Sequence, residues 1–249
     1  MSHIGGDTDN HKTEEKLIPP NNWGEIISAS VTLIEQNRLD IENKIAPCKP
    51  RIIGVTKYFG PDAIINGYRA GIRDFGESRA IEAIRKIESL PEEIRNKAIF
   101  HFIGHLQTNK VEKVVEYFKY IHSVDSLKLA KVISETACRL NKRVNILLQV
   151  NNAKEEQKFG YDTKVLQSEF HEILNLEGIN IIGLMNMAPL KASDEELRKI
   201  FGDLRKFKEH LEKEHGITLP ELSMGMSNDF AIATKEGATM IRVGRKLFN

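Results

Sequence analysis

Cysteine, tryptophan and long apolar runs are scarce in this sequence of 249 residues, which has two cysteines and one tryptophan. Because Cys48 and Cys138 form no CxxC pair and no Cys/His cluster is present, the sequence argues against a disulfide scaffold and a structural zinc site, and favours a reducing compartment. No apolar run approaches the roughly 20 residues of a membrane span, and the polar N-terminus does not resemble a signal peptide. We therefore expect a soluble, cytoplasmic protein.

The sequence also lacks an excess of charge of either sign. Its formal net charge is +1, which gives no electrostatic reason to expect nucleic acid or an anionic membrane as a partner. The hydrophobic share is 41% and the charged share is 29%, as in an ordinary globular protein that buries a sizeable core.

The length limits the number of domains. It is close to the size of about 250 residues typical of one (β/α)₈ barrel, and it is too short for such a barrel and a second substantial domain. Residues 1–20 mix Gly, Asp, Asn and Lys before Pro19 and Pro20, so they are expected to form a flexible tail. Residues 21–249 are expected to form the single domain.

Beyond residue 50, short β-rich runs alternate with longer segments that have helical spacing. The clearest helix is expected over 193–214, where Ser193 is a good N-cap and acidic residues fill the first turn. The expected strands cover 51–56, 71–75, 99–104, 120–124, 144–151, 179–187, 221–225 and 240–244. Further helices are expected to begin near Pro61, Glu77, Thr108, Ser126, Asp162 and Asn228.

Eight strands alternating with helices predict a parallel sheet, because each crossover returns the chain to the same strand direction. We predict a single (β/α)₈ TIM-type barrel. A doubly wound open sheet is the alternative, but the first strand ends in VTKYFG (55–60), which lacks the GxGxxG turn. The last strand ends five residues before the C-terminus, so no helix is expected after it. An extra N-terminal helix over 22–45 could fill that place and close the ring.

In such barrels the functional residues lie at the C-terminal ends of the strands. Lys57 follows the apolar run 51–56 and precedes Tyr58. A partly desolvated lysine at a barrel mouth can act as a nucleophilic amine toward an aldehyde; the alternative is a surface lysine that merely starts a loop. The other polar or glycine residues expected at this end are Glu77, Ser78, His101, Gly104, His105, Ser123, Asp125, Asn151, Asn186, Ser223, Ser227, Arg242, Gly244 and Arg245.

Two of these segments together suggest a phosphate site. SMGMSND (223–229) places two serines where a helix begins, and hydroxyl and backbone N–H groups at a helix N-terminus bind phosphate. Gly244 ends the last strand, where glycine lets the backbone approach an anion closely. Loops after strands seven and eight are the usual phosphate site of this architecture. The alternative is that Ser227 is only an N-cap and Gly244 only a turn glycine.

No metal site is expected. His101 and His105 are four residues apart, but they fall on a strand and its exit rather than on one helix face. We expect His101 to be a packed or hydrogen-bonded strand histidine.

Seven segments carry a family resemblance. They are VTK (55–57), FGESRAIEA (75–83), HFIGHLQTNK (101–110), HSVDSLKLA (122–130), LLQVNNAKEEQKFG (147–160), GLMNM (183–187) and LSMGMSNDFAIATKEGATMIRVGRKLF (222–248). In these segments and in their order, the sequence resembles the YggS/PROSC family of pyridoxal phosphate homeostasis proteins. That resemblance implies a fold similar to the N-terminal barrel of alanine racemase.

The resemblance also implies a cofactor, pyridoxal 5′-phosphate (PLP), held as a Schiff base on Lys57. Arg242 would face the pyridine nitrogen. Because a guanidinium does not readily give up a proton, that nitrogen stays unprotonated and the ring is a weaker electron sink. The phosphate contacts of the family map onto Ser223, Met226, Ser227, Gly244 and Arg245. Ser78, a further cofactor-side contact, stands where the family often has Asn, and Arg245 stands where it often has Thr or Ser.

Two function classes compete. The resemblance favours a non-catalytic PLP carrier in intracellular PLP homeostasis, a monomer with PLP-dependent apoenzymes as possible partners. The alternative is a PLP-dependent amino-acid racemase, which needs a second base opposite Lys57. In alanine racemase that base comes from a second domain, which is not expected in a sequence that ends at Asn249; Tyr58 and Tyr161 are the tyrosines nearest the predicted mouth. A third hypothesis is a barrel enzyme that acts on another phosphorylated metabolite without PLP.

Overall fold

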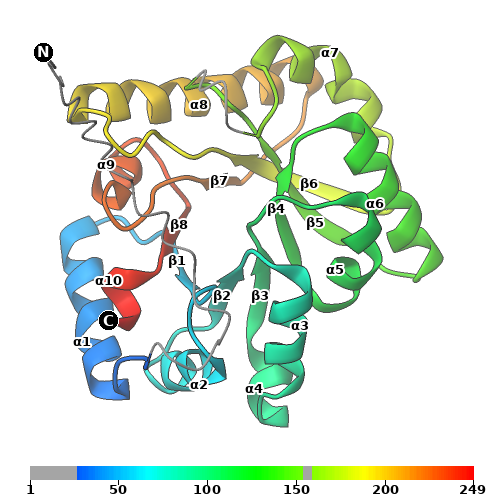
Figure 1. Cartoon of the computed structure of the whole chain (residues 1–249). Helices are drawn as coiled ribbons and strands as arrows, with labels where there is room; N and C mark the ends of the chain where they lie inside the picture. Colours follow the sequence, from blue (N-terminus) through cyan, green and yellow to red (C-terminus); the bar gives the residue numbers. More distant parts are fainter. Residues whose placement is uncertain (1–26, 154–158) are drawn as a thin grey trace, which may run out of the picture.

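The protein forms a closed barrel of eight parallel strands (Figure 1). The computed structural model describes residues 27–153 and 159–249, so the tail predicted over 1–20 lies outside the described residues. The strands are β1 (Arg51–Val55), β2 (Asp74–Glu77), β3 (Ile99–Phe102), β4 (Tyr120–Val124), β5 (Val144–Gln149), β6 (Ile179–Met185), β7 (Glu221–Ser223) and β8 (Met240–Val243). Each strand pairs with the next and β8 pairs with β1, which confirms the predicted barrel over the open sheet.

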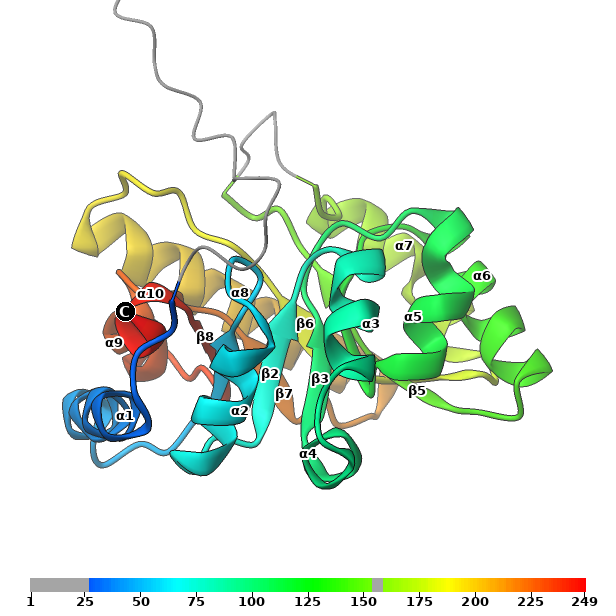
Figure 2. The same ribbon diagram turned by 60° about the horizontal axis from the view of Figure 1, so that its bottom comes forward.

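Helices cover the outside of the barrel, as Figures 1 and 2 show. They are α1 (Val31–Ile45), α2 (Pro61–Arg69), α3 (Ala80–Glu88), α4 (Glu92–Lys97), α5 (Val111–Tyr117), α6 (Leu127–Arg139), α7 (Thr163–Leu174), α8 (Asp194–His215), α9 (Phe230–Lys235) and α10 (Arg245–Phe248). The helix predicted over 193–214 is confirmed as α8, which begins with a capping box between Ser193 and Glu196. None of the helices in the described ranges has the length and apolar content that crossing a bilayer would require.

Helix α1 packs against α2, α9 and α10, next to the seam between β1 and β8 (Figure 1). The extra N-terminal helix therefore fills the place beside the last strand, as predicted. It begins later than the predicted residue 22, because the Ser30 hydroxyl caps it by accepting a hydrogen bond from the Leu33 backbone N–H. Residues 27–30 are not helical, and residues 22–26 lie outside the described ranges.

The prediction that no helix follows the last strand was wrong, because the four-residue helix α10 follows β8. A segment this short shows no helical periodicity in the sequence. Its position is fixed by Phe248, which is buried over β1: a Cβ added to Gly54 would lie 2.9 Å from the Phe248 ring. Phe248 also packs against Phe59, with ring centroids 5.6 Å apart.

Strand β2 covers 74–77 rather than the predicted 71–75, and the following helix begins at Ala80 rather than at Glu77. Glu77 is instead a buried strand residue, whose Oε1 accepts hydrogen bonds from Lys86 Nζ at 2.6 Å and from Thr56 Oγ1 at 2.7 Å. The short helix α4 was also missed.

Two apolar clusters form the core. The larger cluster lies between the sheet and the helices and includes the fully buried rings of Phe75, Phe102, Phe170 and Phe201. The smaller cluster lies inside the barrel and consists of Ile53, Leu147, Ile182, Met185 and Met240. Because side chains alternate between the two faces of a strand, β1, β5, β6 and β8 supply residues to both clusters. The barrel interior also contains buried polar side chains, which belong to the candidate site.

Replacing Lys86 by Met should lower the free energy of unfolding by about 3–5 kcal/mol, because the Glu77 carboxylate would stay buried without its cation. The matched control is Lys97→Met, since Lys97 pairs with Glu93 at 3.0 Å on an exposed surface and exposed pairs contribute little. Urea denaturation of both variants measures the difference. Adding Glu77→Gln to the Lys86 variant should recover part of the loss. Equal stability of the two single variants would contradict this role for the buried pair.

Candidate functional site

Lys57 lies at the mouth of the barrel, where the C-terminal ends of the strands meet. It follows Thr56, whose backbone N–H donates to the carbonyl of Gly76 at 3.1 Å and continues the pairing of β1 with β2. Lys86 fixes the same turn by donating to the carbonyl of Thr56 at 2.8 Å. Lys57 is half-buried, and its Nζ lies 4.8 Å from the ring centroid of Tyr58, within the range of a cation–π contact. The structure thus places this lysine at the predicted end of the barrel.

The loops after β7 and β8 meet at the same mouth. The backbone N–H of Gly244 donates to Ser227 Oγ at 3.4 Å. A Cβ on Gly244 would lie 3.3 Å from the carbonyl oxygen of Val55, so this backbone lies close to the end of β1. Gly225 has a φ of +91°, and a Cβ there would lie 2.6 Å from the Cβ of Ala233, so the loop after β7 requires glycine at this position. The two segments predicted to cooperate are therefore adjacent.

The other residues predicted at the mouth differ in exposure. Met226 is half-buried, and its backbone N–H donates to Asp229 Oδ1 at 2.5 Å, which orders the loop after β7. Arg245 is the first residue of α10 and is exposed. Ser78 follows β2, is half-buried, and lines a cavity of about 270 Å³ together with His105 and neighbouring residues.

Arg242 is a buried cation inside the barrel and is only 4% exposed. Its Nη1 donates to Ser223 Oγ at 2.6 Å, and its Nη2 donates to the backbone carbonyl of Asn186 at 2.7 Å. Burial lowers the pKa of Arg242 to about 10, so the guanidinium stays protonated at neutral pH. Arg242 thus donates two hydrogen bonds, to acceptors at the ends of two different strands, and these bonds fix the orientation of its guanidinium.

Ser223 is more deeply buried than Ser227. It is fully buried, and its hydroxyl contacts Arg242 Nη1 and His122 Nδ1, the latter at 2.8 Å. Ser223 is the last residue of β7 and faces the barrel interior, whereas Ser227 lies four residues later in the loop. The sequence did not indicate this difference, because both serines belong to one short motif.

Two buried histidines, His101 and His122, lie in the same barrel interior as Arg242. His101 Nδ1 is 2.9 Å from His122 Nε2, and His101 Nε2 is 2.8 Å from Asp74 Oδ1. Burial lowers the pKa of His101, and burial with the nearby His101 and Arg242 charges holds the pKa of His122 well below 6.5. The prediction that His101 is a hydrogen-bonded strand histidine is confirmed. His122 and Asp74 were missed, although a histidine within the otherwise apolar run YIHSV was an available signal.

One buried polar atom beside this cluster has no partner in the described part of the chain. Asn186 follows β6 and is 1% exposed; its Nδ2 donates to Asn152 Oδ1 at 3.0 Å, but its Oδ1 accepts no hydrogen bond. Buried polar atoms normally have a hydrogen-bond partner, so an unpaired one next to Arg242 marks a site that suits a polar ligand. Within residues 27–153 and 159–249 no group of three or more His, Cys, Asp or Glu side chains could hold a metal ion.

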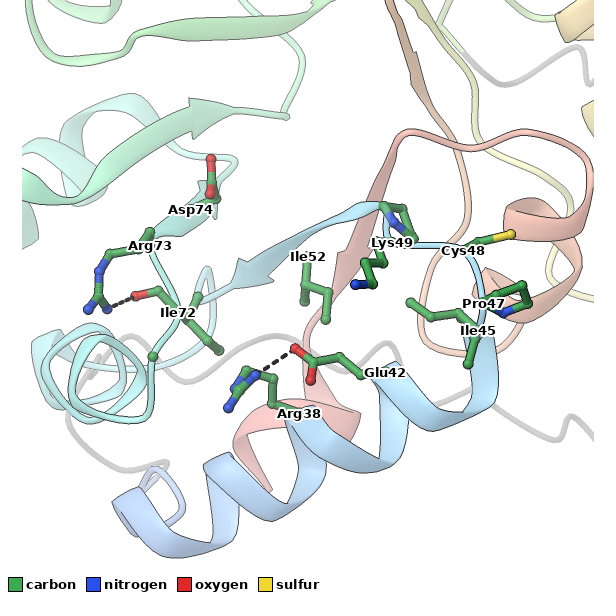
Figure 3. A pocket seen from close by; sticks show the side chains of 13 residues that line it. Arg38, Glu42, Ile45, Pro47, Cys48, Lys49, Ile52, Ile72, Arg73 and Asp74 are labelled. Atoms are coloured by element: carbon green, nitrogen blue, oxygen red, sulfur yellow. Dashed lines mark hydrogen bonds and ion pairs between the residues drawn. The ribbon is translucent and has the colours of Figure 1, made fainter.

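A larger cavity, of about 530 Å³, lies at the opposite end of the barrel, between α1 and the N-terminal ends of β1 and β2 (Figure 3). On one side Arg38 and Glu42 of α1 form an ion pair at 2.6 Å, and on the other side lie Arg73 and Asp74. The residues with cofactor chemistry are at the other end, so we place the candidate site at the mouth. Asp74 is one of the residues that line this cavity, and its side chain is 13% exposed.

Comparison with known proteins shows the family of this chain. The alanine racemase N-terminal domain family matches residues 30–249. Two curated relatives are pyridoxal phosphate homeostasis proteins. The one from Synechocystis sp. is 42% identical over 81% of this chain and 92% of its own length. The one from Aquifex aeolicus is 37% identical over 80% of this chain and 86% of its own length.

Solved structures of similar proteins have the same fold as this chain. PipY of Synechococcus elongatus is 37% identical over 87% of this chain and 100% of its own; its structure without PLP superposes with a TM-score of 0.81, and its structure with PLP bound with 0.79. An alanine racemase of Clostridium difficile is 16% identical, with a TM-score of 0.73 over 90% of this chain and 62% of that chain. At that identity, the racemase supports the fold alone.

The free energy of unfolding should decrease as the pH falls below about 6.5, because both buried histidines bind a proton in the unfolded chain but not in the folded one. The unfolded state then binds more protons, so stability rises with pH, by up to about 1.4 kcal/mol per pH unit for each histidine. Urea denaturation between about pH 7.5 and 5.5 measures this slope. His122→Phe should flatten it, whereas His171→Gln, at an exposed site, should leave it unchanged. A slope that neither variant alters would contradict the assignment.

Proposed function

The chain belongs to the pyridoxal phosphate homeostasis protein family, and we propose that it holds PLP covalently on Lys57 as a carrier rather than an enzyme. The observation that carries the proposal is the convergence of three groups at one barrel mouth. These are the amine of Lys57, the Ser227–Gly244 pair and the fixed guanidinium of Arg242. The Lys57 amine suits the aldehyde of PLP, the Ser227–Gly244 pair suits its phosphate, and the Arg242 guanidinium suits its ring nitrogen.

Each group at the mouth has a distinct role in this proposal. The Lys57 amine bonds to the aldehyde carbon with loss of water, and the Ser227 hydroxyl and Gly244 N–H bind phosphate oxygens. Met226 contributes loop backbone, Arg245 adds positive charge, and Ser78 contacts the cofactor from the β2 side. Because its hydroxyl already contacts Arg242 and His122, Ser223 acts through Arg242 rather than on the phosphate. When bound, the cofactor supplies an electrophilic aldehyde and a conjugated ring.

The charge state of Arg242 favours a carrier. A guanidinium that stays protonated donates a hydrogen bond to the ring nitrogen but does not transfer a proton to it. The ring then withdraws electrons less strongly, and carbanion chemistry at an attached amino acid is damped. The two fixed hydrogen bonds from Arg242 to Ser223 and Asn186 maintain this arrangement.

The tyrosines also argue against a racemase, which needs a base on each face of the substrate carbon. Tyr161 is 3% exposed and belongs to the core between the sheet and the helices. Burial raises its pKa above the ordinary value of 10, so it stays protonated at neutral pH. The ring of Tyr58 lies against Lys57 and is 44% exposed. Neither tyrosine is placed as a second base opposite Lys57.

A carrier has to transfer its cofactor to another protein, and we propose PLP-dependent apoenzymes as the recipients. We also propose that the protein acts as a monomer. Three large apolar side chains support contact at this end. Tyr58, Phe159 and Leu190 are exposed and lie in the segments that follow β1, β5 and β6. Exposed apolar side chains near a barrel mouth are suited to transient contact with a partner.

Lys57→Ala should abolish covalent PLP binding. With the natural protein, added PLP should give a visible absorption band that disappears on borohydride reduction and a pyridoxyl adduct that peptide mass mapping locates on Lys57. The control is Lys49→Ala, at the opposite end of the barrel, which should keep the adduct. A natural protein that stays colourless with added PLP, or an adduct on another lysine, would refute the proposed anchor.

The PLP-loaded protein should not racemise common amino acids above the rate of free PLP. Chiral chromatography of alanine, serine and lysine after long incubation with stoichiometric protein provides the measurement. Robust turnover that disappears in the Lys57→Ala variant would instead establish the racemase alternative. Inorganic or sugar phosphate in the purified protein, without a reducible adduct, would favour an enzyme acting on another phosphorylated metabolite.

A further inference from the structure

A continuous line of hydrogen bonds crosses the barrel interior from β8 to β2. It joins five side chains, which we call the interior network: Asp74, His101, His122, Ser223 and Arg242, from β2, β3, β4, β7 and β8. In that order the successive donor–acceptor distances are 2.8, 2.9, 2.8 and 2.6 Å. Because β4 and β7 are not neighbours in the sheet, the contact between His122 and Ser223 spans the interior of the barrel.

The two ends of the network determine the direction of every hydrogen bond in it. Arg242 can only donate, and the Asp74 carboxylate can only accept. His101 therefore carries its proton on Nε2, toward Asp74, and a neutral His101 accepts on Nδ1. His122 must then donate from Nε2 and accept on Nδ1, so the Ser223 hydroxyl donates to His122 and accepts from Arg242. All donors point toward Asp74.

The opposite direction would require an additional buried charge. If His122 carried its proton on Nδ1, His101 would have to donate from Nδ1 to His122 as well as from Nε2 to Asp74. His101 would then be a cation, although it is fully buried. Burial of an imidazolium is unfavourable, so the neutral, one-way arrangement is the consistent one.

The Asp74 end of the network is fixed by its own contacts. Arg51 lies 3.5 Å from Asp74 and 3.9 Å from Glu221, and its guanidinium is 5.5 Å from the ring centroid of Tyr120. The Tyr120 ring in turn stacks on His101, with centroids 4.5 Å apart and planes inclined by 5°. His101 thus has a fixed ring plane as well as two fixed hydrogen bonds.

We propose that Asp74, His101 and His122 are positioning residues, which hold Ser223 and Arg242 in the orientation that Arg242 needs to donate to the cofactor's ring nitrogen. The proposal rests on the proposed PLP function. The nearby carboxylate of Asp229 raises the pKa of Arg242 against the effect of burial, and hydrogen bonds aligned in one direction polarise one another, so the network adds the influence of Asp74 to that of Asp229. The network therefore keeps the ring nitrogen unprotonated from the far end of the barrel.

Apolar residues could fill this space, as the neighbouring Ile53, Leu147 and Met240 do. A buried polar network stabilises a fold poorly compared with well-packed apolar groups. Its presence beside an apolar cluster is therefore better explained by its effect on Arg242 than by stability. Asp74, at the end of the network, is also one of the residues that line the cavity beside α1 (Figure 3).

The first test needs no cofactor. Long-range proton–nitrogen NMR of histidine-labelled, PLP-free protein reports which ring nitrogen carries the proton. We expect both His101 and His122 in the Nε2–H form, assigned by comparison with His101→Gln and His122→Phe. Asp74→Asn keeps an acceptor oxygen and should preserve this pattern, whereas Asp74→Leu should disturb it. An Nδ1–H form of His122 in the natural protein would overturn the proposed direction.

The second test measures the bound cofactor. His122→Phe and Asp74→Leu should each shift the visible absorption band of the PLP-loaded protein and weaken PLP binding by roughly tenfold or more, because Arg242 loses charge-assisted hydrogen-bond support. Asp74→Asn keeps the acceptor oxygen but not the negative charge, so its band shift and its loss of affinity should be smaller than those of Asp74→Leu. Met240→Leu, which changes packing in the same interior but no polar contact, should alter neither.

The outcomes separate this inference from the proposed function. If borohydride reduction of His122→Phe still gives the pyridoxyl adduct on Lys57, while the visible absorption band and the affinity for PLP change, the network positions Arg242 as proposed. An unchanged band and affinity in both His122→Phe and Asp74→Leu would overturn the inference and leave PLP binding intact. A natural protein that forms no adduct would refute the proposed function, whatever the NMR of the PLP-free protein shows.

Discussion

Arg51–Gly54 of β1 pair in parallel with Met240–Val243 of β8, and this pairing closes the barrel. Closure removes both sheet edges and brings all eight strand ends to a single mouth. The C-terminal ends of β1 and β8 are far apart in sequence, yet they meet across this seam, where the Gly244 backbone approaches Val55. The helices α1 and α10 cover the seam from outside. Without the β1–β8 pairing, the Lys57 amine, the Ser227–Gly244 pair and the Arg242 guanidinium would not be brought to the same end of one barrel.

The barrel interior combines two kinds of packing. One part is apolar and contains Ile53, Leu147 and Met240, and the other holds a guanidinium, two imidazoles and a hydroxyl out of water. Burying such groups is unfavourable unless each donor and acceptor is paired. The neutral histidines satisfy this condition, because each accepts on one nitrogen and donates from the other. The interior thus tolerates Arg242 where the cofactor's ring is expected.

The same barrel serves proteins with different roles. An alanine racemase with 16% identity shares it, so the fold alone does not distinguish a carrier from an enzyme. The distinction has to come from individual groups at the mouth. In the function we propose, the protonated Arg242 weakens the electron sink, and the core position of Tyr161 argues against a role as a base. These features, together with the membership of the pyridoxal phosphate homeostasis protein family, support the proposal of a carrier.

The sequence by itself determined the strand–helix alternation, the closed barrel, the family, and the positions of Lys57, Ser227 and Gly244. These follow from residue type and local spacing, and from the rule that parallel barrel strands end at one mouth. Only the tertiary structure decided that Ser223 faces inward, that Glu77 ends a strand instead of starting a helix, and that His122 links Ser223 to His101. Each depends on a partner 9, 21 or 101 positions away along the chain. Local patterns carry no information about which distant side chains meet, because that is fixed only when the barrel closes.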